Sequence, residues 1–174
     1  MGQLTAPKPV KLIIGIICND SELIDKVLLQ LEGLYGKIDS KSDLMDFDKT
    51  IYYNEEMGQG LKKIFVSFEK LIKPEDIIDI KLKTNEIEDS LTYHNTSNRR
   101  INLDPGYISA ANLILATTKD FSHRIYLGRG IFAEVTLIYS KGRYNILDWT
   151  FPDFRQEKYH RYFIKVREIY FRGF

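Results

Sequence analysis

The apolar run from Leu12 to Cys18 constrains the fold more than any other feature of the sequence. It contains no polar residue, so the segment Lys11 to Cys18 is predicted to be a strand that is apolar on both faces and central in a sheet. The run is far shorter than the roughly 20 residues of a membrane-spanning helix, and no secretory signal accompanies it. We therefore expect a cytoplasmic protein without a membrane partner.

The chain of 174 residues is predicted to form a single α+β domain, residues 1–174, with a possible internal subdivision near residues 93–100. Hydrophobic residues make up 44% and charged residues 28% of the chain, a balance typical of a globular protein. The single cysteine, Cys18, excludes an intrachain disulfide and a cysteine-rich zinc site. Its place at the end of an apolar strand favours an inert core thiol.

Hydrophobic periodicity divides the rest of the chain into helices and short strands. Ser140-Lys141-Gly142 has the composition of a hairpin turn, which favours an antiparallel meander in the C-terminal part. The predicted fold is a mixed, largely antiparallel sheet with about three helices packed on it, ending in a β-meander and an amphipathic helix. The predicted helices cover residues 21–34, 74–91 and 156–172, and the predicted strands cover residues 11–18, 44–48, 63–68, 100–103, 113–117, 123–127, 131–139 and 143–151.

Basic character is concentrated at the C-terminus, although the formal net charge is only +1. The predicted helix 156–172 has two clear faces, as a repeat of 3.6 residues requires, and its aromatic face is expected to pack on the sheet. The opposite, basic face makes an RNA or an acidic protein a candidate partner, although an ordinary charged helix face is the simpler interpretation. The apolar stripe is Tyr159, Phe163, Val166 and Tyr170, and the polar stripe is Arg161, Lys165, Glu168 and Arg172.

The predicted strand 131–139 places Glu134 between apolar neighbours, where a carboxylate needs water, a cation or a ligand. Arg124 is the candidate partner, because residues 124 and 134 lie equally far from Arg129 in an antiparallel pair that turns through Gly128 to Gly130. The pair is either a structural ion pair or an anion-binding fork that Glu134 holds in place. Alternation predicts one face with Ile131, Ala133, Val135, Leu137 and Tyr139, and another with Phe132, Glu134, Thr136 and Ile138.

The segment from Asn102 to Tyr107 is predicted to be a polar turn that directly follows a strand. Pro105 restrains Asp104, and Gly106 permits a positive φ, so turn formation alone explains the segment. Alternatively, Asn102 and Asp104 present their oxygen atoms on one side to a metal or to a ligand hydroxyl.

Several other polar residues follow predicted strands or share a helix face. Lys119 lies in a loop before His123, a combination that suits phosphate binding or proton transfer, although a solvated turn is the simpler interpretation. Asp153 is a candidate N-cap for the terminal helix. The helix 74–91 carries Lys81, Asn85 and Glu88 on one face, at intervals of four and three, and such a row is most often solvated surface.

Six segments resemble an uncharacterised bacterial family, the domain-of-unknown-function family 4416. The resemblance covers nearly the whole chain and implies a bacterial cytoplasmic protein, without an established activity. The segments are TIYYNEEMG (50–58), SFEKLI (67–72), KLKTNEIE (81–88), INLDPGYI (101–108), LATTKDFSHRIYLGRGIFAEVTL (115–137) and WTFPDFR (149–155).

Two functional hypotheses follow. The favoured one is a site for an anionic, phosphorylated or nucleotide-like small molecule, at which a reaction is conceivable but not indicated by any motif. The alternative is a noncatalytic module that binds RNA or protein through the basic terminal helix. No motif specifies a cofactor, a metal or an oligomeric state. The candidate catalytic residues are Glu134, His123 and Asp104, and the candidate ligand-binding residues are Arg124, Lys119, Asn102, Tyr126 and Thr136.

Overall fold

The computed structural model describes residues 2–48 and 52–173. Within these residues, nine strands form one open sheet in the order β2-β4-β1-β5-β6-β8-β7, with β3 beside β4 and β9 beside β8. Every pairing among them is antiparallel. The strands are β1 (Lys11–Cys18), β2 (Ile38–Lys41), β3 (Met45–Asp46), β4 (Lys62–Phe68), β5 (Asn102–Ile108), β6 (Asn112–Thr117), β7 (Ile125–Gly128), β8 (Ile131–Ser140) and β9 (Arg143–Ile146).

The predicted α+β class and the antiparallel arrangement are confirmed, and β1 has the central place that its composition predicts. All eight residues of β1 are buried, and β1 pairs with β4 on one side and with β5 on the other. Two apolar faces suit this position because helices cover both sides of the sheet.

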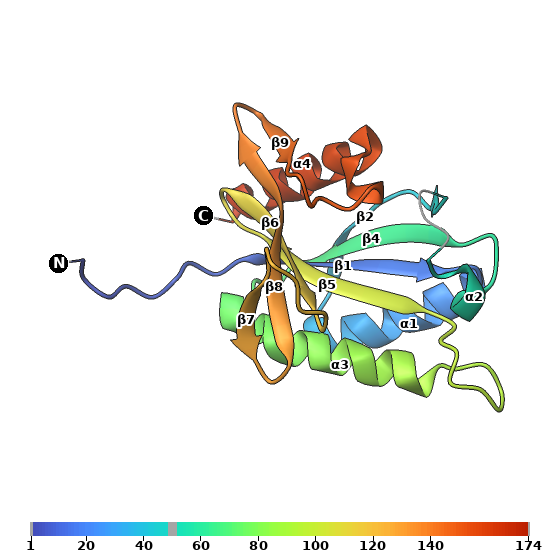
Figure 1. Ribbon diagram of the computed structural model, residues 1–174. Coiled ribbons are helices and arrows are strands. Elements are labelled where there is room, and N and C mark those ends of the chain that lie inside the picture. The colour runs from blue at the N-terminus through green and yellow to red at the C-terminus, as the bar shows by residue number, and fades with distance from the viewer. Residues whose placement is uncertain (1, 49–51, 174) are drawn as a thin grey trace.

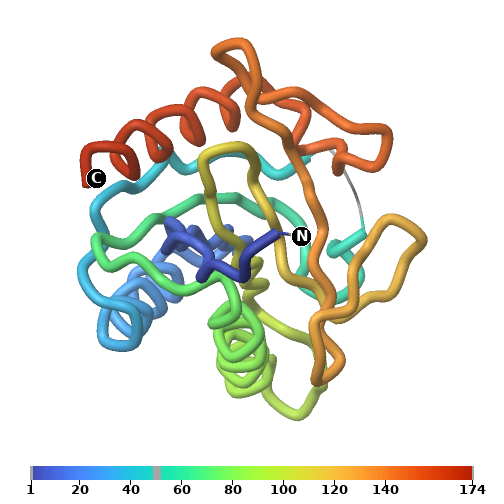
Figure 2. The backbone as a smooth tube through the Cα atoms, turned by 90° about the vertical axis from the view of Figure 1, so that its left-hand side faces the viewer, coloured from blue at the N-terminus to red at the C-terminus, as the bar shows by residue number. Residues whose placement is uncertain are grey.

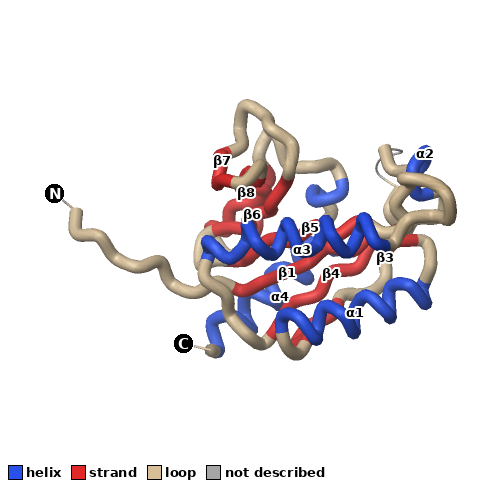
Figure 3. The backbone as a smooth tube through the Cα atoms, turned by 90° about the horizontal axis from the view of Figure 1, so that it is seen from below, coloured by secondary structure: helices blue, strands red, loops and turns tan. Residues whose placement is uncertain are grey.

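The helices form one layer on each face of the sheet (Figures 1 and 2). Figure 3 shows α1 and α3 lying across the face opposite to α4. On the α4 face, the predicted aromatic stripe is buried against Phe65, whose ring lies 4.8 Å from the Tyr159 ring and 5.0 Å from the Phe163 ring, centroid to centroid. The helices are α1 (Ser21–Tyr35), α2 (Asn54–Met57), α3 (Ile77–Ser90) and α4 (Glu157–Arg172), and short 3-10 helices occupy Pro74–Asp76 and Asp153–Arg155.

The predicted turn at residues 102–107 is wrong, because these residues belong to β5. They pair with β1 along the whole strand, from Lys11 opposite Ile108 to Ile17 opposite Asn102. Gly106 does not have a positive φ. A glycine is needed at position 106 for a different reason, because a Cβ atom there would lie 2.3 Å from the Ile114 carbonyl oxygen of β6.

The sheet divides beside Gly106. The pairing of β5 with β6 extends only from Gly106 opposite Leu115 to Ile108 opposite Leu113, and it stops at Pro105, which has no N–H to donate. Beyond this point β6 continues with β8 alone, and Figure 1 shows β6 and β8 crossing the direction of β1 and β5 steeply. The result is a gap between β5 and β6.

The simple alternation predicted for β8 is also wrong. Leu115 lies opposite Glu134 and Leu113 lies opposite Leu137, so Glu134 and Leu137 share a face, whereas strict alternation separates them. A β-bulge accounts for the change, because one extra residue of β8 is accommodated between the pairs of Leu113 and Ile114.

Other boundaries differ at the strand ends. The sequence prediction omits β2, whose short polar segment Ile38–Lys41 lacks an apolar alternation. The last predicted strand is shorter in the structure, because β9 ends at Ile146. The hairpin before it has the predicted turn, with positive φ at Lys141 and Gly142.

Candidate functional site

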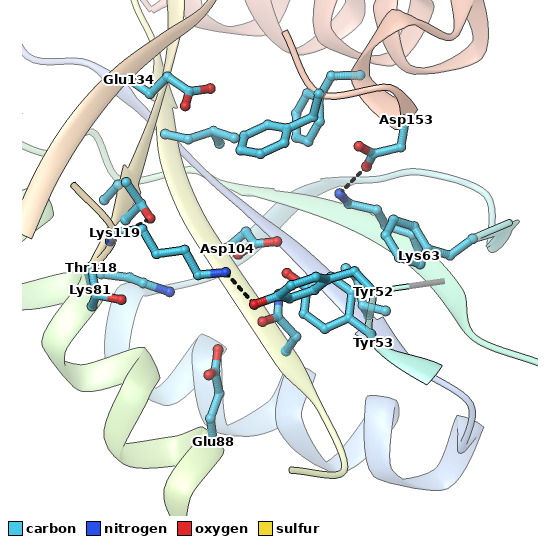
Figure 4. A pocket seen from close by; sticks show the side chains of 18 of the residues that line it. Tyr52, Tyr53, Lys63, Lys81, Glu88, Asp104, Thr118, Lys119, Glu134 and Asp153 are labelled. Carbon is cyan, nitrogen blue, oxygen red and sulfur yellow. Dashed lines mark hydrogen bonds and ion pairs between the residues drawn. The ribbon is translucent and has the colours of Figure 1, made fainter. Parts of the chain in front are cut away.

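A cavity of about 460 Å³ opens where β5 and β6 part. Ile17, Asn102 and Asp104 line it from one face of β1 and β5, the face that α4 covers further along the sheet. Thr117, Thr118 and Lys119 line it from the end of β6. Figure 4 shows Asp104 behind the cavity, with Lys119 in front of it and Lys63 and Asp153 to one side. The volume is within the range of roughly 300–1,000 Å³ that small-molecule sites occupy.

Glu134 and Arg124 form the predicted cross-strand pair on the wall of this cavity. The Arg124 Nε atom donates to Glu134 Oε2 at 2.9 Å, and the Glu134 side chain is only 1% exposed. The register that places Ile125 opposite Ala133 makes this contact, as equal spacing around Arg129 predicts. Arg124 Nη1 also donates to the Lys119 carbonyl oxygen at 2.9 Å. The guanidinium is therefore held at two points.

His123 lies behind this pair and does not line the cavity. Its Nε2 atom is 2.9 Å from Glu134 Oε2, and its ring stacks on Trp149 with 5.0 Å between ring centroids. The Trp149 indole N–H in turn donates to the Val135 carbonyl oxygen at 2.8 Å. His123 therefore contacts the cavity only through Glu134.

Thr136 and Tyr126 also lie outside the cavity lining. Thr136 is buried, and its hydroxyl lies 3.3 Å from Glu134 Oε1. Tyr126 is exposed, and its ring contacts Phe132 with 5.1 Å between centroids. Of the two, only Thr136 contacts a residue of the cavity wall.

Lys119 extends over the cavity toward Tyr52 (Figure 4). Its Nζ atom donates to the Tyr52 hydroxyl oxygen at 2.7 Å and lies 4.4 Å from the centre of the Tyr52 ring. Tyr53 lines the cavity beside Tyr52, and burial, reinforced by the Asp104 carboxylate, raises the pKa of Tyr53 well above its ordinary value. Tyr53 is therefore a neutral hydroxyl group at physiological pH.

The α3 residues Lys81 and Glu88 are buried and line the cavity, so the expectation of a solvated row is wrong. α3 covers the other face of the sheet, but the gap between β5 and β6 leaves Lys81 and Glu88 open to the cavity. Lys81 Nζ donates to the Leu103 carbonyl oxygen at 3.0 Å. Burial raises the pKa of Glu88 above its ordinary value, even though Arg99 donates to it at 2.7 Å.

Lys63 of β4 is a further cavity residue that the sequence did not single out. It is buried, and its Nζ atom lies 2.6 Å from Asp153 Oδ2 and 4.4 Å from the centre of the Phe154 ring. Asp153 therefore pairs with Lys63 and does not cap α4 as predicted, since the N-cap residue of α4 is Gln156. Residues 49–51, between the cavity residues Phe47 and Tyr52 in sequence, lie outside the described residues.

The charges of the cavity wall are unequally paired. Lys63 pairs with Asp153, and Arg124 pairs with Glu134. Arg99 pairs with Glu88 and also with Glu56, which lies outside the cavity lining. Three charged residues of the wall, Lys81, Lys119 and Asp104, form no ion pair within residues 2–48 and 52–173. Two ammonium groups and one carboxylate therefore face the cavity.

No group of three or more histidine, cysteine or acidic side chains suited to a metal ion occurs among the described residues. In the same part of the chain, no helix combines the length and the apolar character needed to cross a bilayer. The basic outer residues of α4, such as Arg161 and Lys165, are exposed. Arg161 forms an ion pair within the helix, with 3.6 Å between its Nη1 atom and Glu157 Oε1. Binding of RNA or protein by this face stays a prediction.

The fold and the site together define an α+β protein with one antiparallel sheet that divides around a polar cavity. Residues 8–170 match a family model described as a domain of unknown function (DUF4416), and the chain belongs to this family. No curated protein and no solved structure matches the chain. Arguments about function therefore depend on the site itself.

Proposed function

We propose that the cavity between β5 and β6 binds a small organic anion. The observation that carries this proposal is the unequal pairing of its wall, in which Lys81, Lys119 and Asp104 have no ion-pair partner among the described residues. With two cations and one carboxylate, the unpaired groups carry one excess positive charge. An anionic ligand compensates this charge at low cost, because the ammonium groups already lie at the cavity wall.

Arg124 supports the proposal because its guanidinium is oriented before a ligand arrives. Glu134 and the Lys119 carbonyl oxygen hold its Nε and Nη1 atoms, and its Nη2 atom has no hydrogen bond within the described residues. A planar guanidinium fixed in this way suits carboxylate or phosphate oxygens. Glu134 is then a positioning residue, because both of its oxygen atoms contact protein groups.

The aromatic residues of the wall support an organic ligand over a bare inorganic ion. Tyr52, Tyr53, Phe151 and Phe154 line the cavity and offer ring faces or edges to carbon atoms. If a reaction occurs here, Asp104 is the carboxylate placed to exchange a proton with the ligand, since Glu134 is occupied by His123 and Arg124.

A thermal-shift screen of the full chain tests the proposal. The compounds are inorganic phosphate, sugar phosphates, nucleoside phosphates and small dicarboxylates. At a concentration of about 100 Kd, a ligand should raise Tm by about 5 °C or more, because such binding stabilises the folded state by roughly 2.7 kcal/mol.

Lys119→Ala should weaken the binding of the best compound by about tenfold, through loss of one charge-assisted hydrogen bond. Lys165→Ala, which removes an exposed lysine of α4 away from the cavity, is the matched control and should bind normally. Absence of any ligand-dependent shift, or equal weakening in both variants, would contradict the proposal.

A further inference from the structure

Asn102 has a buried polar atom without a partner. The side chain lines the cavity, the residue is 4% exposed, and its Nδ2 atom has no hydrogen bond within the described residues. A buried amide donor without a partner costs roughly 1–3 kcal/mol of stability, so such atoms are rare and call for an explanation. The cavity wall therefore contains a hydrogen-bond donor that the fold itself does not use.

The orientation of this donor is fixed by an ionic network behind it. Asn102 Oδ1 accepts from Arg99 Nη1 at 3.1 Å, so the other end of the amide, Nδ2, is the free end. Arg99 is held by Glu56, at 2.6 and 2.8 Å, and by Glu88 at 2.7 Å. Glu88 also accepts from the Leu103 N–H at 2.5 Å. Networks of this kind behind a site orient the residue that contacts the ligand.

Asp104 provides an acceptor beside this donor. Residues 102 and 104 point to the same face of β5, because they lie opposite Ile17 and Gly15 of β1. The Asp104 carboxylate is half-buried at the cavity and has no hydrogen-bond partner within the described residues. Opposite it, Gly15 carries no side chain that could cover the carboxylate.

We propose that Asn102 and Asp104 form a polyol subsite, and that the ligand of the cavity is a sugar phosphate. A hydroxyl group both accepts and donates, so neighbouring hydroxyls satisfy the Asn102 amide and the Asp104 carboxylate together. Cα atoms two apart on a strand are separated by about 6.6 Å, a span that two hydroxyls of one sugar ring bridge when both side chains reach toward it. The phosphate then lies toward Lys81, Lys119 and Arg124, so this inference rests on the proposed function.

Calorimetric titration of the full chain with matched sugars tests the subsite. The sugar probes are ribose 5-phosphate and glucose 6-phosphate, each paired with its 2-deoxy form. A nucleoside monophosphate with its 2′-deoxy form and inorganic phosphate complete the set. At least one of the two sugar phosphates should bind tenfold or more tightly than its deoxy form, because removing a hydroxyl leaves a buried polar group unpaired. Ribose 5-phosphate and glucose 6-phosphate should each bind more tightly than inorganic phosphate.

Two isosteric variants assign the effect to the proposed residues. Asn102→Asp keeps the acceptor for Arg99 and removes the donor, and it should weaken sugar-phosphate binding at least tenfold. Asp104→Asn should abolish the preference for the hydroxylated sugar, and because it removes a carboxylate from the cavity wall it should bind inorganic phosphate at least as tightly as wild type. Asp89→Asn, at an exposed position of α3, is the control and should change neither value.

The outcomes separate this inference from the proposed function. Equal affinity for both members of each pair, with inorganic phosphate still bound, would overturn the polyol subsite and leave the anion site standing. A nucleoside monophosphate that binds more tightly than every sugar phosphate, with no dependence on its 2′-hydroxyl, would show that the subsite reads a nucleobase edge instead. Binding of none of these probes would overturn the sugar-phosphate ligand, and if the small dicarboxylates of the thermal-shift screen also failed to bind, the anion site would be refuted as well.

Discussion

The Arg124 guanidinium meets the Glu134 carboxylate at 2.9 Å in a place where the carboxylate is almost completely removed from water. Glu134 Oε2 accepts from Arg124 and contacts His123, so this oxygen joins two residues that precede β7 to the middle of β8. Because charges so deeply buried require close partners, the contact fixes both the strand pairing and the orientation of the cavity wall.

Glu134→Gln should therefore lower the free energy of unfolding by about 3 kcal/mol, since it leaves the Arg124 charge buried without its counter-charge. Urea denaturation at neutral pH measures the change. Glu157→Gln, which removes a carboxylate 3.6 Å from the exposed Arg161, should stay within about 0.5 kcal/mol of wild type. Equal stabilities of the two variants would show that the Glu134 pair has no special role.

The buried Lys63–Asp153 pair should show strong coupling in a double-mutant cycle. Asp153→Asn alone should cost about 3 kcal/mol, because the Lys63 ammonium group lies 2.6 Å from Asp153 and is nearly inaccessible to water. Adding Lys63→Met, which removes the buried cation but keeps the apolar stem, should recover at least half of this loss. Purely additive effects of the two substitutions would rule out the coupling.

Gly106→Ala should destabilise the protein by about 3 kcal/mol or more, because the new Cβ atom would meet the Ile114 carbonyl oxygen at 2.3 Å. Thermal unfolding compares it with Gly33→Ala in α1, where a Cβ atom has nothing within 4 Å. The Gly33 variant should gain about 0.5–1 kcal/mol, since alanine favours a helix. If Gly106→Ala were neutral, the close approach of β5 and β6 would be wrong.

Tyr144→Phe should make the protein more stable and less sensitive to alkaline pH. The Tyr144 hydroxyl is buried without a hydrogen-bond partner among the described residues, and burial raises its pKa above the ordinary value of 10. The folded state therefore retains a proton that the unfolded chain releases, so stability is lost as the pH rises above about 10.

Urea denaturation of wild type and Tyr144→Phe at pH 7 and pH 10.5 checks both effects. The variant should gain about 1 kcal/mol at pH 7 and lose less stability at pH 10.5. The remaining alkaline loss comes from other buried tyrosines, such as Tyr159 and Tyr162, whose pKa values are also raised by burial. An identical loss in both proteins would contradict the assignment to Tyr144.

Parts of the candidate site follow from local sequence rules. The Arg124–Glu134 contact is predictable because antiparallel pairing with equal spacing around Arg129 places these two residues across from each other, and the pairing of Ile125 with Ala133 has this register. The shared orientation of Asn102 and Asp104 is predictable from their spacing, even though the surrounding segment is a strand and not a turn.

Other parts of the site could not be predicted from local sequence rules. Lysine and glutamate usually lie at the surface of a protein, yet Lys63, Lys81 and Glu88 are all buried. Their burial depends on Asp153, Leu103 and Arg99, which are distant in sequence and become partners only when the sheet forms. The β8 bulge likewise depends on pairing with β6, and alternation within β8 alone does not reveal it.

The sequence by itself determined the central strand β1 and the terminal helix α4, because an apolar run and a repeat of 3.6 residues specify them without reference to distant residues. Only the tertiary structure decided where the cavity lies. Its position results from the parting of β5 and β6 beside Pro105 and Gly106, and from ion pairs that join β4 to the segment before α4 and α3 to the segment before β5. Long-range pairing and charge burial are properties of the assembled sheet, so no local pattern encodes them.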